Sequence, residues 1–247
     1  MNRVLVSLLL VLTLACASFA AAQTLDEIPF DKKLKLAEVG DEEAQMDVAA
    51  TYEKGSKETK KSLVEAARWY REAALKGNIE AEFRLARLVS KGAKGLTKDL
   101  KTAAKLYEAA AKSGHLEAQN AIGHAYQNGL GVPVDEAKAV EWYRKAAEGK
   151  LAVAQNNLGI LYLNGKGVER NLSEAFKLFK MAADQGDGWG LNNLGGMYEM
   201  GWGVAKDRNK AASFYRQAAE KGIESAQANL VRVAPAGAPV TPPVTLN

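Results

Sequence analysis

The residue types that most often bind metals are scarce in this sequence. It contains two histidines, His115 and His124, and a single cysteine, Cys16. The histidines are nine residues apart. At about 100° per residue they would point to opposite faces of a helix, so they cannot share a metal ion. One cysteine allows neither an internal disulfide nor a multi-cysteine site. We therefore expect no metal site and no cofactor.

Glycine-rich segments are a second feature with possible chemistry. Gly-x-Gly pairs such as Gly165 and Gly167 lack the third glycine of a dinucleotide-binding loop, and no strand is expected before them. Gly159, Gly165 and Lys166 have the wrong spacing for a phosphate-binding loop. The motifs H-E-x-x-H, G-x-S-x-G and S-x-x-K do not occur in the sequence. We predict that the protein is not an enzyme and that no residue is catalytic.

Composition excludes further classes of protein. Charged residues make up 25% and hydrophobic residues 47% of the 247 residues, which is too polar for a multi-span membrane protein. The net charge of +4 is mild, and basic and acidic residues are interleaved. A nucleic-acid-binding protein usually has a basic stripe, so no nucleic acid is expected as a partner.

The first residues are typical of a secretory signal peptide. Arg3 provides the positive charge, residues 4–15 are apolar, and residues 20–22 form an A-x-A site, which predicts cleavage between Ala22 and Gln23. The mature chain would lack cysteine and an integral membrane segment, and would be periplasmic or secreted. A lipoprotein signal with Cys16 as the lipidated residue is the alternative, although Thr13 stands where leucine is expected.

An Ala-Ala pair recurs along the chain. The pairs are Ala73-Ala74, Ala110-Ala111, Ala146-Ala147, Ala182-Ala183 and Ala218-Ala219, spaced by 37, 36, 36 and 36 residues. Each follows a couplet of large apolar residues, Trp69-Tyr70, Leu106-Tyr107, Trp142-Tyr143, Leu178-Phe179 and Phe214-Tyr215. A constant period of this length predicts a repeat array, in which each unit buries its apolar face against its neighbours.

Each unit is predicted to contain two helices. In the second helix of the third unit, Ala139, the Trp142-Tyr143 couplet and the Ala146-Ala147 pair form an i, i+3, i+4, i+7 stripe. In the first helix of the fourth unit, Leu158-Gly159 and Tyr162 share a face. The small residues would let the helices approach closely.

Glycines and short polar residues mark the expected helix ends. One glycine series is Gly55, Gly92, Gly129, Gly165 and Gly201, and the other is Gly77, Gly114, Gly149, Gly186 and Gly222. The residues expected to cap the second helices are Asp99, Asp135, Ser173 and Asp207.

The units resemble those of the Sel-one-like (Sel1-like) repeat family, a relative of the tetratricopeptide repeats. The best match is residues 154–162, AQNNLGILY, followed by Gly165-Lys166-Gly167-Val168. The resemblance implies an all-α fold, a right-handed α/α superhelical solenoid of about five antiparallel helix pairs. It also implies a protein–protein interaction module. Repeats one and two depart from the motif by one extra loop residue each.

The period divides the chain as follows. We expect a signal peptide at 1–22, an N-terminal capping segment at 23–40, repeats at 41–77, 78–114, 115–149, 150–186 and 187–222, a C-terminal capping helix at 223–233 and a disordered Pro-rich tail at 234–247.

The resemblance further implies that the first helices line a concave groove. The groove positions in register are Phe83, Arg87, Asn120, His124, Gln127, Asn156, Ile160 and Asn192. Asn120, Asn156 and Asn192 would form a ladder, which either binds the backbone of a partner or satisfies polar groups between stacked repeats. Trp189 and Trp202 do not recur in other units, so they are candidate anchors or covers for an apolar edge. Trp69 and Trp142 belong to the recurring couplet and are expected in the core.

These features lead to one main hypothesis and two alternatives. The main hypothesis is an exported scaffold or adaptor, expected to be a monomer, that binds a protein or peptide in its groove. The first alternative is a periplasmic immunity protein that neutralises a secreted effector such as a lipase. The second is binding of a cell-wall fragment, or binding and hydrolysis of a β-lactam.

Overall fold

The computed structural model describes residues 28–233, and the predicted signal peptide, Cys16 and the Pro-rich tail lie outside these residues. The helices of this range are α2 (Phe30–Glu38), α3 (Glu42–Lys54), α4 (Leu63–Ala74), α5 (Ile79–Lys91), α6 (Leu100–Lys112), α7 (Leu116–Asn128), α8 (Glu136–Glu148), α9 (Ala152–Asn164), α10 (Leu172–Asp184), α11 (Gly188–Met200), α12 (Arg208–Glu220) and α13 (Glu224–Val233). Between residues 28 and 233 the only β-type pairing is an isolated bridge between Ala93 and Leu96.

The chain forms two compact units, Met1–Trp69 and Tyr70–Asn247, with the boundary inside α4. In the first unit, α2 packs against α3. The rings of Phe30 and Tyr52 meet edge-on at 5.4 Å between centroids. The buried Gln45 side chain donates to the Ala37 carbonyl at 3.1 Å.

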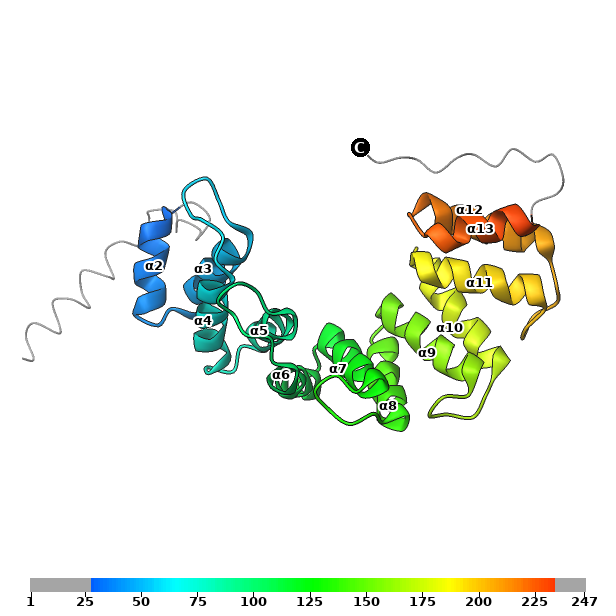
Figure 1. The fold of residues 1–247 in the computed structure, drawn as a ribbon, viewed down its shortest axis with the longest axis horizontal. Coiled ribbons are helices and arrows are strands. Elements are labelled where there is room, and N and C mark those ends of the chain that lie inside the picture. Colours follow the sequence, from blue (N-terminus) through cyan, green and yellow to red (C-terminus); the bar gives the residue numbers. More distant parts are fainter. Residues whose placement is uncertain (1–27, 234–247) are drawn as a thin grey trace, which may run out of the picture. The chain divides into compact units, whose positions relative to one another are not determined.

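The second unit consists of helix pairs stacked in chain order (Figure 1). Each helix from α5 to α13 packs against the next, and α11 also contacts α9 and α13. The repeat array predicted from the period, and the all-α solenoid of antiparallel helix pairs that the resemblance implied, are therefore confirmed. Stacking is required because each helix pair has an apolar face that it cannot bury by itself.

Glycines in the first helices allow close contact with aromatic rings in the second helices. A Cβ atom added at Gly123 would lie 2.9 Å from the Tyr143 ring, and one added at Gly159 would lie 2.7 Å from the Phe179 ring. Each glycine thus leaves room for a ring of the second helix of its own unit.

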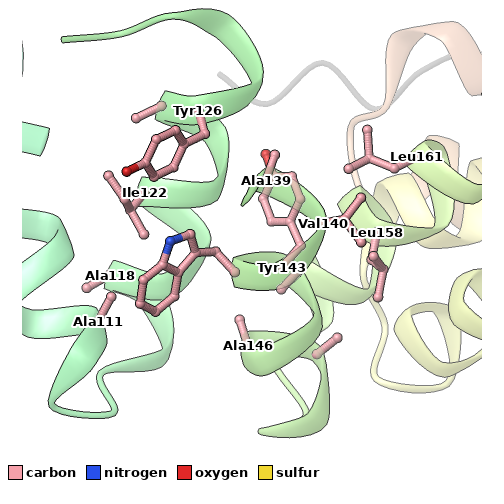
Figure 2. Close-up of a cluster of buried hydrophobic side chains, with 14 of the residues drawn as sticks. Ala111, Ala118, Ile122, Tyr126, Ala139, Val140, Tyr143, Ala146, Leu158 and Leu161 are labelled. Carbon is pink, nitrogen blue, oxygen red and sulfur yellow. The ribbon is translucent and has the colours of Figure 1, made fainter. Parts of the chain in front are cut away.

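Figure 2 shows the core around α7, α8 and α9. Ile122 and Tyr126 of α7 face Tyr143 of α8, and Leu158 and Leu161 of α9 close the other side. The couplet tryptophans are buried as predicted, with 3% of Trp69 and 9% of Trp142 exposed.

Helix caps agree with the prediction except at two places. The side chains of Asp99, Asp135 and Asp207 accept hydrogen bonds from backbone amides of the first turn. In the fourth repeat the cap is Asn171 and not Ser173, because the Asn171 side chain accepts from the Glu174 amide at 3.0 Å.

The second correction concerns the end of α8. Gly149 was expected to close this helix in the left-handed conformation, yet the residue with positive φ is Lys150, at 65°. Lys150 is 36 residues before Gly186, which occupies the same position with φ of 79°. The glycine of the third repeat has thus moved one position toward the N-terminus, and a lysine adopts the strained conformation in its place.

Candidate binding surface

The three asparagines of the predicted ladder are used inside the fold. The Oδ1 atoms of Asn120, Asn156 and Asn192 each accept a hydrogen bond from an asparagine of the following helix pair. The pairs are Asn157–Asn120 at 3.0 Å, Asn193–Asn156 at 2.8 Å and Asn229–Asn192 at 3.0 Å. These bonds favour the structural alternative, in which the ladder satisfies polar groups between stacked repeats.

Sequence reasoning did not find the second member of each asparagine pair. The signal was present as the Asn156-Asn157 and Asn192-Asn193 couplets, which place two amides side by side on a first helix. A similar link was also missed. The buried side chains of Gln119 and Gln155 donate to backbone carbonyls eight residues earlier, at the end of the preceding helix.

Gln127 contacts the second helix of its own unit. Its Oε1 atom accepts a hydrogen bond from the Tyr143 hydroxyl at 2.8 Å. Glu199 occupies the same position two repeats later and accepts from the Tyr215 hydroxyl at 2.7 Å. The Arg232 guanidinium also donates to both carboxylate oxygens of Glu199, at 2.8 and 2.7 Å. These bonds from Arg232 hold the pKa of Glu199 below its usual value, although burial opposes the shift.

Phe83 lies against other rings instead of standing free. Its ring stacks on His115 at 4.5 Å between centroids and is tilted against Tyr107 at 5.9 Å. His115 accepts from the Ala118 amide through Nδ1, which makes it the N-cap of α7, and its Nε2 atom lies 2.9 Å from a carboxylate oxygen of Glu80. Burial alone would raise the pKa of Glu80, but the hydrogen bonds from His115 and Arg84 lower it.

Arg87, His124 and Ile160 occupy equivalent positions of successive first helices, and the series continues at Gly196 and Arg232. His124 is exposed, whereas Arg87 and Ile160 are partly buried. A Cβ atom added at Gly196 would meet only the Tyr215 hydroxyl, at 3.6 Å. His124 is therefore the exposed side chain of the first three positions, whereas Ile160 packs against an apolar cluster and Arg232 pairs with Glu199.

The two non-recurring tryptophans have different surroundings. Trp189 in the first turn of α11 is 53% exposed, and so is Met200 at the other end of that helix. Trp202 is partly buried and packs against the apolar cluster that contains Leu194 and Met197. Trp202 thus fits the role of a cover for an apolar edge, and Trp189 fits the role of an anchor.

The first helices α9 and α11 carry little charge. Helix α9 contains no charged residue, and Glu199 is the only one in α11. The Glu199 charge is matched by Arg232. A surface that presents an exposed indole can bind a protein through apolar contact.

Within residues 28–233, no three acidic, histidine or cysteine side chains gather into a group that could hold a metal ion. None of the helices in that range combines the length and apolar character needed to cross a bilayer.

Comparison with known proteins gives the following matches. The family model described as "Sel1 repeat" matches residues 42–78, 79–115, 116–151, 152–187 and 190–223. No curated protein matches the chain.

Three solved structures illustrate the likeness. The Escherichia coli protein c5321, described as a protective antigen of uropathogenic strains with an SLR fold, is 36% identical with a TM-score of 0.77, over 83% of this chain and 44% of that one. A Sel1 repeat protein from Oxalobacter formigenes is 27% identical with a TM-score of 0.73, over 81% and 86% of the two chains. The immunity protein PA5088 from Pseudomonas aeruginosa is 23% identical with a TM-score of 0.51, over 81% and 72%. The present chain thus spans less than half of the E. coli protein.

Proposed function

The chain belongs to the Sel1 repeat family, whose repeats form a protein-interaction fold, and from this premise we propose that it is an exported scaffold that binds a protein partner. The proposed surface consists of the first helices α7, α9 and α11. The family is in general a non-enzymatic binding scaffold, and we propose the same for this protein. We further propose that it acts as a monomer.

The observation that carries this proposal is the exposure of Trp189 on α11, a first helix whose only charged residue is Glu199. An indole that is 53% exposed leaves apolar area in water at a cost in free energy. Tryptophan is among the residues that most often dominate the binding energy of protein interfaces. His124 and Ile160 lie on the first helices of earlier repeats and extend the same surface.

The test combines capture of a partner with a matched substitution. A tagged protein is used to isolate partners from native extract, and the affinity of any purified partner is then measured by titration. We expect Trp189→Ala to weaken binding by about 2 kcal/mol, or roughly thirtyfold. Leu75→Ala serves as control, because Leu75 is 77% exposed and lies outside α7, α9 and α11. A partner that binds the Trp189→Ala variant with unchanged affinity would contradict the proposal.

The structure changes the choice of variants for this test. Substitution of Asn192 would remove the acceptor of Asn229 and disturb the stacking of α11 and α13. Loss of binding in such a variant would report on folding as much as on the surface. Trp189 is 53% exposed and belongs to none of the asparagine pairs, which makes it the cleaner substitution.

Export is proposed from the sequence of residues 1–22. The positive Arg3, the apolar residues 4–15 and the A-x-A site at residues 20–22 support it. N-terminal sequencing of the protein isolated from its own cells is expected to begin at Gln23. An intact Met1 would overturn export, and a lipidated Cys16 would place the protein on a membrane surface.

An immunity function is the second candidate. Two structures of this fold are named immunity proteins, at 23% and 24% identity, and this likeness shows the fold alone. The capture experiment separates the candidates by the activity of the partner. A secreted enzyme that loses activity on stoichiometric addition of the protein would support immunity, and a partner whose activity is unchanged would support a scaffold.

A further inference from the structure

A cavity of about 390 Å³ lies between helices α5, α6 and α7. Its apolar lining comes from Leu100, Leu130 and four alanines, and its polar lining comes from Ser90, Lys98, Tyr107, Asn120 and His124. Ligand pockets in proteins are typically of this size or larger and combine apolar walls with a few converging polar groups. None of the described residues that line the cavity carries a carboxylate.

The polar groups of the cavity are mainly donors. The Ser90 hydroxyl donates to the Arg87 carbonyl at 2.9 Å, so the Tyr107 hydroxyl, 3.4 Å from it, is the one that can donate to a bound acceptor. Burial raises the pKa of the Tyr107 phenol, which therefore stays protonated and able to donate. The Asn120 carbonyl is already engaged by Asn157, which leaves its amide group as the available donor.

The charge at the cavity is positive. Lys98 lines the cavity, and four more lysines lie within seven residues of it in the chain: Lys91, Lys94, Lys101 and Lys105. The only acidic residue between positions 91 and 105 is Asp99, the N-cap of α6, so five lysines face a single carboxylate in this segment. A negative charge placed among the donors of this cavity would therefore be attracted by the loop as a whole.

We propose that this cavity binds the C-terminal residue of the protein partner. Its apolar walls require an apolar side chain, and its donors and Lys98 require an anion within the same small volume. In a polypeptide, the residue that offers both is an apolar C-terminal residue with its own carboxylate. This inference rests on the proposed scaffold function, because it specifies which part of the partner is bound.

The test uses small probes and needs no partner. N-acetyl-leucine, N-acetyl-leucinamide and the α-amide of N-acetyl-aspartate are titrated into the full-length protein, and backbone amide shifts are followed by NMR. We expect N-acetyl-leucine to shift amides of α5, α6 and α7 and to bind on the order of tenfold more tightly than the neutral leucinamide. We expect the aspartate derivative, which has a carboxylate but no apolar side chain, to bind more weakly as well.

Variants locate the site. Tyr107→Phe keeps the ring and is expected to weaken N-acetyl-leucine binding about tenfold. Lys98→Gln is expected to weaken it about threefold, because the ammonium lies near solvent. Lys94→Gln removes the same charge from the same loop outside the cavity and is expected to have no effect on the affinity.

Three outcomes would overturn the proposal: equal affinities for the acid and the amide, shifts confined to other helices, or equal binding by all variants. Tight binding of the aspartate derivative would overturn a terminal residue as the ligand. Failure of the probes leaves the Trp189-dependent capture of a partner intact. Conversely, if the capture experiment isolated no partner, the scaffold function would be overturned, and binding of N-acetyl-leucine in the cavity would be unaffected by that result.

Discussion

Two adjacent glycines in the middle of α11 have different reasons to lack a side chain. A Cβ atom at Gly195 would lie 2.8 Å from the Tyr215 ring, whereas one at Gly196 would meet only the Tyr215 hydroxyl at 3.6 Å. Packing within the repeat therefore requires glycine at position 195 and permits alanine at position 196.

This difference predicts opposite effects of the same substitution. Gly196→Ala is expected to stabilise the protein by about 0.5–1 kcal/mol, because alanine loses less conformational freedom in a helix. Gly195→Ala is expected to destabilise it by about 1–3 kcal/mol through overpacking. Urea unfolding of the two variants measures both free energies. Destabilisation by Gly196→Ala would show that the space around this residue is smaller than the structure indicates.

Lys150 provides a second prediction for a single residue. Its φ of 65° is costly for a residue with a Cβ atom, and four of the five repeats carry glycine at this position. We expect Lys150→Gly to raise the free energy of unfolding by about 1 kcal/mol. Lys145→Gly, within α8, is the control and should lower it by a similar amount. A loss of stability in Lys150→Gly would contradict the strained conformation.

Between elements, the asparagine pairs link successive repeats. The Asn156 side chain is 5% exposed, and its carbonyl accepts from Asn193 at 2.8 Å. Asn193→Ala would leave this buried acceptor without a donor, at a cost of about 1–3 kcal/mol in the free energy of unfolding. Asn164→Ala, at the exposed end of α9, should cost much less. If both variants unfold at the same urea concentration, the pairs contribute nothing to stacking.

The last helix, α13, is held to α11 by the ion pair between Arg232 and Glu199. Since hydrogen bonds from Arg232 lower the folded-state pKa of Glu199, this group stabilises the folded state above its unfolded pKa near 4.5. The contribution is lost as the pH falls through the folded-state pKa. We expect Arg232→Gln to lower the free energy of unfolding by about 1 kcal/mol at pH 7.

The pH dependence supplies the check on this ion pair. At a pH below the lowered pKa of Glu199, this group is protonated in both proteins, so the difference in unfolding free energy between Arg232→Gln and the parent should shrink. A difference of the same size at pH 7 and in acid would mean that Arg232 acts through packing and not through charge.

The helices of this protein could be predicted from the sequence because their determinants recur five times. The left-handed residue after α8 was expected one position too early, at Gly149, since a lysine in the left-handed conformation has no sequence signature. Of each asparagine pair in the ladder, only the acceptor was predicted from the sequence. The donor was missed because it lies 37 residues further along the chain. The cavity was missed entirely. Tyr107 had been assigned to the recurring couplet, and nothing in the sequence brings it together with Ser90 and Lys98.

For the second unit as a whole, the order of packing determines which helices lose stability when one of them is destabilised. Each helix packs mainly against its neighbours in the chain, so stability is expected to be a sum of local terms and nearest-neighbour terms. A defect at one end should therefore loosen that end first and leave the distant repeats folded. A globular protein with one shared core would instead lose protection throughout.

Leu230 and Leu158 allow this expectation to be tested, because both are 3% exposed and differ only in their place along the array. Leu230→Ala in α13 opens the cluster around Tyr215, and Leu158→Ala opens the cluster between α8 and α9. Each substitution should lower the free energy of unfolding of the repeat that contains it by about 2–5 kcal/mol. By hydrogen exchange, Leu230→Ala should expose amides of α12 and α13 while α7 and α8 stay protected. Leu158→Ala should reduce protection on both sides of α9. Uniform loss of protection in both variants would mean that the repeats unfold as one cooperative unit, and that the surface formed by α7, α9 and α11 cannot open in part when a partner binds.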